Sequence, residues 1–230
     1  MSKSNEKNEP ERLTRGYSGK KKDKNRTMAR LVDAVGIVLK EKGYRGLTAP
    51  NIATAANVSR RLIWMYFGGI ENLIDEFFRQ RDFWKSDSNN SISELLNMPR
   101  KIESKDIAEL LSEQFSTLLQ DDVLQKIIHW ELGEYSASLR KIADEREEIG
   151  EKLFEAIEPG FHNPDVNVRA IMAVAIGGIY YLSLHTKTNG STFCGIDINK
   201  EEGKAQIEKA IQCIVNTTFE KGMQEKRKEN

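Results

Sequence analysis

The sequence predicts an all-α protein of about nine helices, with a helix-turn-helix unit near the N-terminus followed by a larger helical bundle. Two observations predict this fold class. Apolar residues recur with a period near 3.6 along most of the chain, and no alternating segment typical of a strand is longer than about four residues. In addition, 16 Gly and 5 Pro in 230 residues are few for a turn-rich β protein and leave long stretches free to be helical.

Charge is distributed unevenly, although the net charge is zero. Residues 1–67 hold 15 Lys and Arg against 6 Asp and Glu, whereas residues 68–230 hold 20 against 29. A basic first third joined to an acidic remainder indicates a nucleic-acid-binding part attached to a second unit. A charged tail on an ordinary protein would produce the same asymmetry, so charge alone leaves both interpretations open.

Neither a secretory leader nor a membrane span is expected. The first residues are polar and basic with no apolar segment behind them. The longest uncharged stretch, between Arg169 and Lys187, has 17 residues, fewer than the ~20 that a span needs. The two cysteines, Cys194 and Cys213, are too few for a disulfide framework. We therefore expect a soluble, cytoplasmic protein with no membrane partner.

The chain divides into three segments. Residues 1–24 are polar and end in the basic run 20–24, which predicts a disordered basic arm that either contacts DNA or only solubilises the protein. Residues 25–69 are expected to form a helix-turn-helix domain, whose first helix ends at Gly43. Residues 70–230 continue the helical periodicity and are expected to form the bundle.

The stretch 48–67 carries the helix-turn-helix pattern. Thr48 is a good N-cap residue, and Pro50 is tolerated in the first turn because its missing N–H is not needed there. Asn57 tolerates the left-handed conformation that a tight turn demands, and Ser59 can cap the second helix. Two short helices joined by a turn of about three residues are typical of DNA-binding proteins.

Arg60 and Arg61 stand in the first turn of the second helix. The helix dipole disfavours a cation there by roughly 0.3–1 kcal/mol, so a purely structural helix more often carries Asp or Glu. In helix-turn-helix proteins this end of the second helix enters the DNA major groove, where arginine binds guanine or a phosphate. Two solvated surface arginines are the alternative.

This pattern resembles the N-terminal domain of the tetracycline-repressor (TetR) family of bacterial regulators. The spacing from Gly43 through Thr48 to Phe67 is specific to that family rather than to helix-turn-helix proteins at large. The resemblance extends from Leu31 to Ile74. The matching residues are Leu31, Ala34, Val38, Leu39, Gly43, Tyr44, Thr48, Ile52, Ala53, Ala56, Val58, Ser59, Ile63, Tyr66, Phe67, Glu71 and Leu73.

The resemblance implies a set of DNA-contacting residues. The two hydroxyl residues are expected to contact backbone phosphates, and the two arginines the major groove or phosphates. Trp64 stands where the family usually has a Tyr that touches DNA, and Tyr66 is similar to the family's His or Tyr before an almost invariant Phe. The full set is Thr48, Ser59, Arg60, Arg61, Trp64 and Tyr66.

Three positions depart from the family pattern. Asn57 replaces the usual Gly, which is physically acceptable in the turn. Arg61 replaces a common small residue and enlarges the expected DNA footprint. Ile70 replaces the Lys that normally opens the fourth helix and holds a phosphate, so that contact is not expected here.

For the bundle, the resemblance implies a ligand pocket and a homodimer interface. Residues 165–186 are apolar on too many sides for a helix facing water, and 207–219 form an apolar stripe, which fits either a four-helix dimer interface or burial within one chain. For each aromatic residue considered for the pocket, ordinary core packing is the alternative to ligand binding. For the one acidic residue considered, the alternative is a local salt bridge. The candidate pocket residues are Phe115, Trp130, Glu131, Tyr135, Tyr181 and His185.

The resulting hypothesis is a sequence-specific transcriptional regulator that binds double-stranded DNA as a homodimer. By resemblance, it is a repressor released from a palindromic operator by a small-molecule effector, with no metal or other cofactor. An activator, or a regulator without an effector, is the alternative.

A helical enzyme is disfavoured by the sequence. The three histidines, at 129, 162 and 185, lack a Glu three residues before them, and no Cys-x-x-Cys or glycine-rich phosphate loop is present. A structural interaction protein would not explain the two arginines at a helix start.

Overall fold

The computed structural model describes residues 16–80, 88–188, 190 and 192–224, and within these residues the predicted all-α class is confirmed. The ten α-helices and two short 3-10 turns of this part of the chain are α1 (Gly16–Lys42), η1 (Tyr44–Gly46), α2 (Ala49–Ala55), α3 (Arg61–Phe67), α4 (Ile70–Gln80), α6 (Ser88–Leu96), α7 (Ser104–Gln120), α8 (Asp122–Gly133), α9 (Ala137–Ile157), η2 (Glu158–Gly160), α10 (Val168–Thr188) and α11 (Glu201–Met223).

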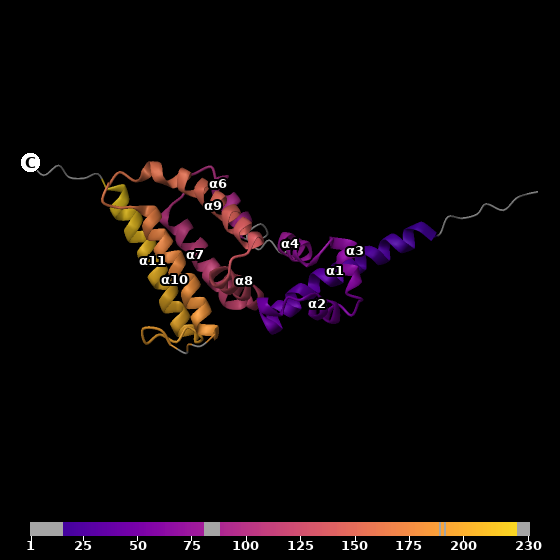
Figure 1. Cartoon of the computed structure of the whole chain (residues 1–230). Helices are drawn as coiled ribbons and strands as arrows, with labels where there is room; N and C mark the ends of the chain where they lie inside the picture. The colour runs from indigo at the N-terminus through magenta and orange to yellow at the C-terminus, as the bar shows by residue number, and fades with distance from the viewer. Residues whose placement is uncertain (1–15, 81–87, 189, 191, 225–230) are drawn as a thin grey trace, which may run out of the picture.

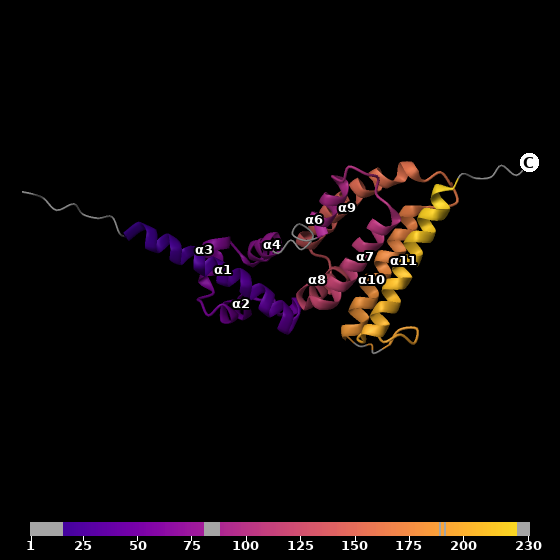
Figure 2. The same ribbon diagram turned by 180° about the vertical axis from the view of Figure 1, so that it is seen from behind.

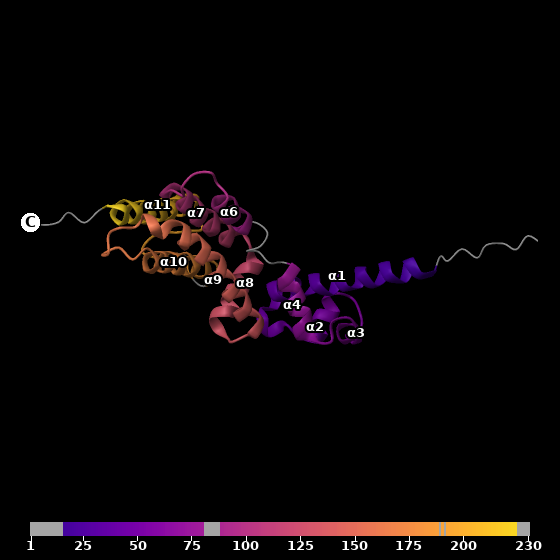
Figure 3. The ribbon, with the colours of Figure 1, turned by 90° about the horizontal axis from the view of Figure 1, so that it is seen from above.

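The helices form two groups along an elongated molecule (Figures 1 and 2). Helices α1 to α4 make a small N-terminal unit, and α6 to α11 make the bundle. Helices α10 and α11 run side by side at the end of the bundle furthest from the N-terminal unit. In the view from above, the N-terminal end of α1 projects away from the rest of the molecule (Figure 3).

The first core holds the N-terminal unit together. Its centre is the apolar stripe of α1, where Leu31, Val35 and Leu39 are fully buried, against Ile52 of α2 and Ile63 of α3. Helix α4 packs its four apolar side chains into the same core, although the sequence assigned residues from 70 onward to the bundle. The first core also includes Val123 of α8 and Leu139 of α9, so it extends beyond α4.

The second core lies inside the bundle. Phe115 of α7, Ile179 of α10 and Val215 of α11 are almost fully buried there, and Ile128 of α8 joins them. Helix α7 begins with a capping box, in which the Glu103 side chain accepts from the α7 backbone and the Asp106 carboxylate accepts the Glu103 N–H. The central helix of the bundle is thus fixed at its start as well as along its length.

Helix α1 begins earlier than the sequence analysis expected. The segment 16–24 was expected to be part of a disordered arm, but it continues α1 from Gly16. Once the packed stripe around Leu31 has nucleated the helix, each residue added toward the N-terminus forms one more backbone hydrogen bond, and lysine is a good helix former. Residues 1–15 of the expected arm lie outside the described residues.

Candidate DNA-binding and ligand-binding sites

The turn between α2 and α3 has the geometry expected from the sequence. The Thr48 hydroxyl accepts the Asn51 N–H at 3.4 Å and thereby caps α2. Asn57 has a φ of 50°, in the left-handed region, and the Val58 N–H donates to the Ala53 carbonyl at 3.0 Å. The Ser59 hydroxyl accepts the Arg61 N–H at 3.4 Å at the start of α3. Local hydrogen bonds therefore set the angle between the two helices.

A contact from α1 also holds this turn, and the sequence analysis missed it. Arg30 donates from Nη2 to the carbonyl oxygens of Ala56, at 2.5 Å, and Asn57, at 3.0 Å. These carbonyls belong to the C-terminal end of α2, where backbone acceptors lack partners within the helix. No local pattern around Arg30 points to a carbonyl 26 residues away.

Helix α3 presents a basic and aromatic surface to solvent. Ile63 is fully buried and anchors the helix to the first core. Arg60 and Arg61 are exposed, and Trp64 is 51% exposed, which is unusual for an indole and leaves its ring available to a partner. Tyr66 is half-buried, with Lys24 Nζ of α1 at 5.4 Å from its ring centroid. The start of α1 thus lies beside α3 and adds positive charge to the same region.

Ile70 opens α4 and packs partly against the first core. The Asn72 side chain, two residues along, donates to the Phe67 carbonyl at the end of α3 at 2.8 Å. The start of α4 is therefore held by packing and by a cap to α3, and Ile70 itself has no group that binds a phosphate.

Helix α8 connects the two cores. Trp130 stacks on Tyr44, with ring centroids 5.6 Å apart and planes 7° from parallel. The Tyr44 hydroxyl donates to Glu134 Oε1 at 3.2 Å, and Arg45 contacts the same oxygen at 3.2 Å. Lys40, near the end of α1, pairs with Asp122 at 2.8 Å. A displacement of α8 would therefore act directly on the end of α1.

The six candidate pocket residues do not line one cavity. Phe115 is fully buried in the second core, and Trp130 lies against the N-terminal unit. Tyr135 is 87% exposed after α8. Tyr181 and His185 stack on each other beside Phe193, near the C-terminal end of α10. The apolar spacing was identified correctly, but which helices face each other is a tertiary property that the spacing does not contain.

Glu131 forms an ion pair with Arg146 of α9, which is the alternative that the sequence left open. The Arg146 side chain is 12% exposed. Burial by itself lowers the pKa of Arg146, but its contacts with Tyr180 and Glu131 outweigh burial and raise that pKa. Arg146 therefore keeps its positive charge, and Glu131 is its partner in the ion pair.

A cavity of about 170 Å³ lies between α6, α7, α9 and α10. Four polar side chains line it, namely Gln114, Arg146, Tyr180 and the water-exposed Glu147. Gln114 Nε2 donates to the Tyr180 hydroxyl oxygen at 3.2 Å, and Arg146 Nη1 donates to the same oxygen at 3.5 Å. The main apolar lining residues are Ile107, Leu111, Leu153, Phe154, Met172 and Ile176. A mostly apolar enclosure with a few convergent polar groups is typical of a small-molecule site.

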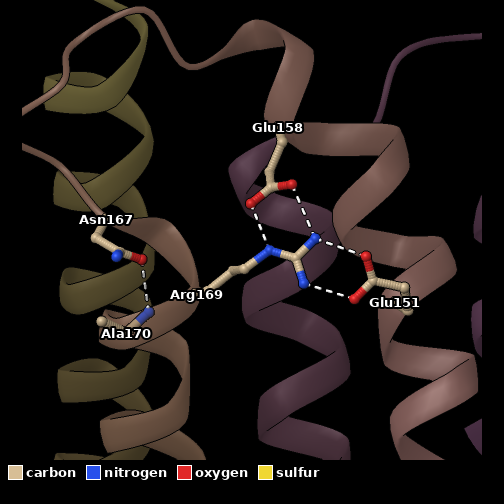
Figure 4. Close-up of polar contacts among 5 residues, drawn as sticks. All are labelled: Glu151, Glu158, Asn167, Arg169 and Ala170. Atoms are coloured by element: carbon tan, nitrogen blue, oxygen red, sulfur yellow. Dashed lines mark hydrogen bonds and ion pairs between the residues drawn. The ribbon is translucent and has the colours of Figure 1, made fainter.

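Arg169 forms an arginine clamp with Glu151 and Glu158 (Figure 4). Arg169, near the start of α10, contacts Glu158 at 2.6 Å and Glu151 of α9 at 2.5 Å, and its guanidinium lies 4.8 Å from the ring centroid of Phe154. Hydrogen bonds from Arg169 lower the pKa of both carboxyl groups and raise the pKa of Arg169 itself. The clamp holds the C-terminal half of α9 against α10.

The outer face of α10 and α11 is apolar and exposed. Val174 is 77% exposed and Ile214 is 41% exposed, although both are aliphatic. Together with their neighbours they line a shallow groove. Its lining residues are Ala170, Ile171, Val174, Ala175, Gly178, Ile179, Leu182, Ile207, Ala210, Ile211 and Ile214. A contiguous apolar surface of this kind marks an interaction site.

Among the described residues, one helix, α10, has the length and apolar composition of a membrane-spanning segment. It is 21 residues long, with a mean hydropathy of 1.4 over its most apolar window, of which 22% is buried. The uncharged stretch within it, of 17 residues, was predicted to fall short of a span. One such helix is weak support for membrane insertion, because apolar helices that pack against other helices have the same composition.

Metal-binding residues are not clustered in the described part of the chain: it contains no group of three or more His, Cys, Asp or Glu side chains placed to hold an ion. The fold and the exposed face of α3 define the class of protein, an all-helical protein in which a helix-turn-helix unit is joined to a bundle.

Comparison with known proteins identifies the family. Residues 31–77 match the family model described as bacterial regulatory proteins, tetR family. The match covers the helix-turn-helix unit and α4, so this part of the chain is similar to the DNA-binding part of TetR-family regulators. No curated protein matches the sequence.

Solved structures of bacterial transcriptional regulators share the fold. NalD of Pseudomonas aeruginosa, the secondary repressor of the MexAB-OprM multidrug efflux pump, is 16% identical, with a TM-score of 0.56 over 87% of this chain and 97% of NalD. The transcriptional regulator FadR of Bacillus subtilis, solved with stearoyl-CoA, is 19% identical, with a TM-score of 0.59 over 83% of this chain and 98% of FadR. FadR of Bacillus halodurans, a regulator of fatty acid degradation, is 19% identical, with a TM-score of 0.57 over 82% and 94%.

Proposed function

We propose that this protein is a transcriptional repressor that binds a palindromic operator as a homodimer and leaves it when a small molecule binds to the bundle. The observation that carries the DNA-binding part is the exposed face of α3. There, two arginines and an indole stand in solvent on a helix anchored by a fully buried Ile63. Such a helix start fits the major groove.

The proposed DNA contacts keep the set implied by the family resemblance. Thr48 and Ser59 are exposed at the starts of α2 and α3, where backbone N–H groups and hydroxyls can meet a phosphate. The arginines are proposed to read bases or neutralise phosphates, and Trp64 to pack against the sugar–phosphate backbone. Tyr66, half-buried beside Lys24, is proposed to contact a phosphate.

The proposed dimer forms through the outer face of α10 and α11. Its occupant is a second copy of the chain, because a two-fold dimer places two α3 helices on two half-sites of one palindrome. Close packing is favoured by Gly177 and Gly178, at which an added Cβ meets open space in the single chain. Because operator DNA lies in the cytoplasm of a bacterium, we expect the protein there.

The proposed effector response passes through α8. Glu131 of α8 pairs with Arg146 at the cavity, and the adjacent Trp130 stacks on Tyr44 in the N-terminal unit. A ligand that displaces Arg146 would shift α8 and with it the end of α1, which changes the spacing of the two α3 helices.

Selection from random duplex DNA, at about 150 mM salt, tests the proposal. We expect a palindrome to be enriched, and Arg60→Ala with Arg61→Ala to abolish its binding without loss of helicity. Lys105→Ala, a solvent-exposed change in the bundle, is the matched control. Salt-sensitive binding with no enriched sequence would contradict the proposal.

A further inference from the structure

We propose that the cavity between α6, α7, α9 and α10 binds a small, uncharged, mostly apolar compound of about one aromatic ring, whose single acceptor oxygen receives a hydrogen bond from Tyr180. The inference rests on the proposed function in one respect only, that the effector binds in the bundle. Size, charge and hydrogen bonding each support the assignment.

The volume limits the ligand to one ring or a short branched chain. The cavity measures about 170 Å³. An engineered apolar cavity of roughly 150 Å³ in another protein stays dry and binds benzene. The walls are aliphatic and aromatic, and the Arg169 guanidinium of the clamp packs over the ring of Phe154. An apolar ring therefore fits, whereas a long acyl chain exceeds the space.

The charges at the cavity exclude an ionic ligand. Arg146 is the cation that reaches the cavity, and its ion pair with Glu131 compensates it. The remaining charged lining residue, Glu147, is exposed to water. A carboxylate would enter the cavity without an unpaired cation to meet it, and an ammonium group would find only the water-exposed carboxylate of Glu147. Transfer of an ion from water to the apolar part of the cavity is strongly unfavourable.

The hydroxyl of Tyr180 favours a ligand that carries a hydrogen-bond acceptor. Its oxygen already receives hydrogen bonds from Gln114 and Arg146, so its own proton is directed elsewhere, and no acceptor for it is found among the described residues. Burial raises the pKa of Tyr180, so the hydroxyl keeps its proton at neutral pH. A carbonyl or ether oxygen of a ligand supplies the acceptor.

Three compounds of similar size and different charge test the charge and size arguments: acetophenone, benzoate and benzylamine. Calorimetry with the full chain at pH 7 should show acetophenone binding at least tenfold more tightly than either ion. Benzoate or benzylamine binding as tightly as acetophenone would overturn the inference, as would no binding by any of the three.

Two variants and one further compound test the hydrogen bond and the location. Tyr180→Phe should weaken acetophenone about five- to tenfold and leave ethylbenzene, which has no acceptor, unchanged. Equal weakening of both would mean that the hydroxyl is not used. Gly150 of α9 lines the cavity, and a side chain there meets open space. Gly150→Leu should therefore fill the cavity and abolish binding of both compounds, and retained binding would place the ligand elsewhere.

The same samples are assayed for binding to the selected DNA without any ligand. DNA binding without compound binding overturns this inference alone. Compound binding without sequence-specific DNA binding overturns the proposed function and leaves the ligand assignment standing.

Discussion

Val174→Glu should convert the protein from a dimer into a monomer without unfolding it. Val174 is 77% exposed in the single chain, so a glutamate there remains in water and the fold of the monomer is unaffected. In the proposed dimer the position is buried, and the two-fold axis introduces the substitution twice. A buried, unpaired carboxylate costs about 3–5 kcal/mol. Two of them weaken the dimer by about 6–10 kcal/mol, which raises the dissociation constant by roughly four orders of magnitude or more.

Sedimentation velocity at micromolar concentration measures the change, and circular dichroism checks the fold. Ala205→Glu is the matched control, because it adds the same charge at a position on α11 that is exposed and lies outside the apolar groove. The control should remain a dimer. A Val174→Glu protein that still sediments as a dimer, or a wild-type protein that is already a monomer, would refute the assignment of this face to a homodimer interface.

Three further predictions concern single side chains. The pKa of Asp106 is about 2, below its ordinary 3.8, mainly because the Arg100 side chain hydrogen-bonds to the charged form; its stabilisation is complete above about pH 4 and is lost as pH falls toward 2. At pH 7 the free energy of unfolding of Asp106→Asn should be about 1–2 kcal/mol lower than that of the wild type. An acid titration followed by circular dichroism should show that the variant loses less stability than the wild type as the pH falls from 4 to 2. Asn57→Val should lower the melting temperature, since a β-branched residue at φ 50° costs about 1–2 kcal/mol, whereas Asn57→Gly should be nearly neutral; equal effects would contradict the left-handed turn. Arg30→Met should speed hydrogen exchange at the Val58 amide about tenfold, because the contacts from Arg30 to the turn carbonyls are lost. Unchanged exchange would mean that the Arg30 contacts do not stabilise the turn.

The helix-turn-helix unit was predictable because its determinants are local. An N-cap hydroxyl at Thr48 and a left-handed Asn57 act within a few residues of their own position, and both have the predicted geometry. The exposure of Trp64 also follows from its place on the helix, since Ile63 next to it must face the core. Its contact with DNA stays a prediction.

The cavity was not predictable, because its polar residues carry no local sign of burial. Arg146 lies in a helix with many charged residues, where a solvated side chain is the ordinary expectation. It is buried only because α9 packs against α7 and α10, which bring Gln114 and Tyr180 to it across 32 and 34 residues of sequence. The candidate aromatics lie in separate regions for the same reason, since spacing defines a face of a helix but not the helix opposite, and their contact with a ligand stays a prediction.

The sequence by itself determined the helical class, the turn between α2 and α3, and the basic and aromatic side chains of α3, because capping, backbone preference and apolar period are properties of neighbouring residues. Only the tertiary structure decided that α4 joins the first core, that α8 connects Trp130 to Tyr44 and Glu131 to Arg146, and that the bundle encloses a cavity with compensated charge. These features depend on which helix faces meet, and that choice minimises exposed apolar surface over the whole chain rather than within any one segment.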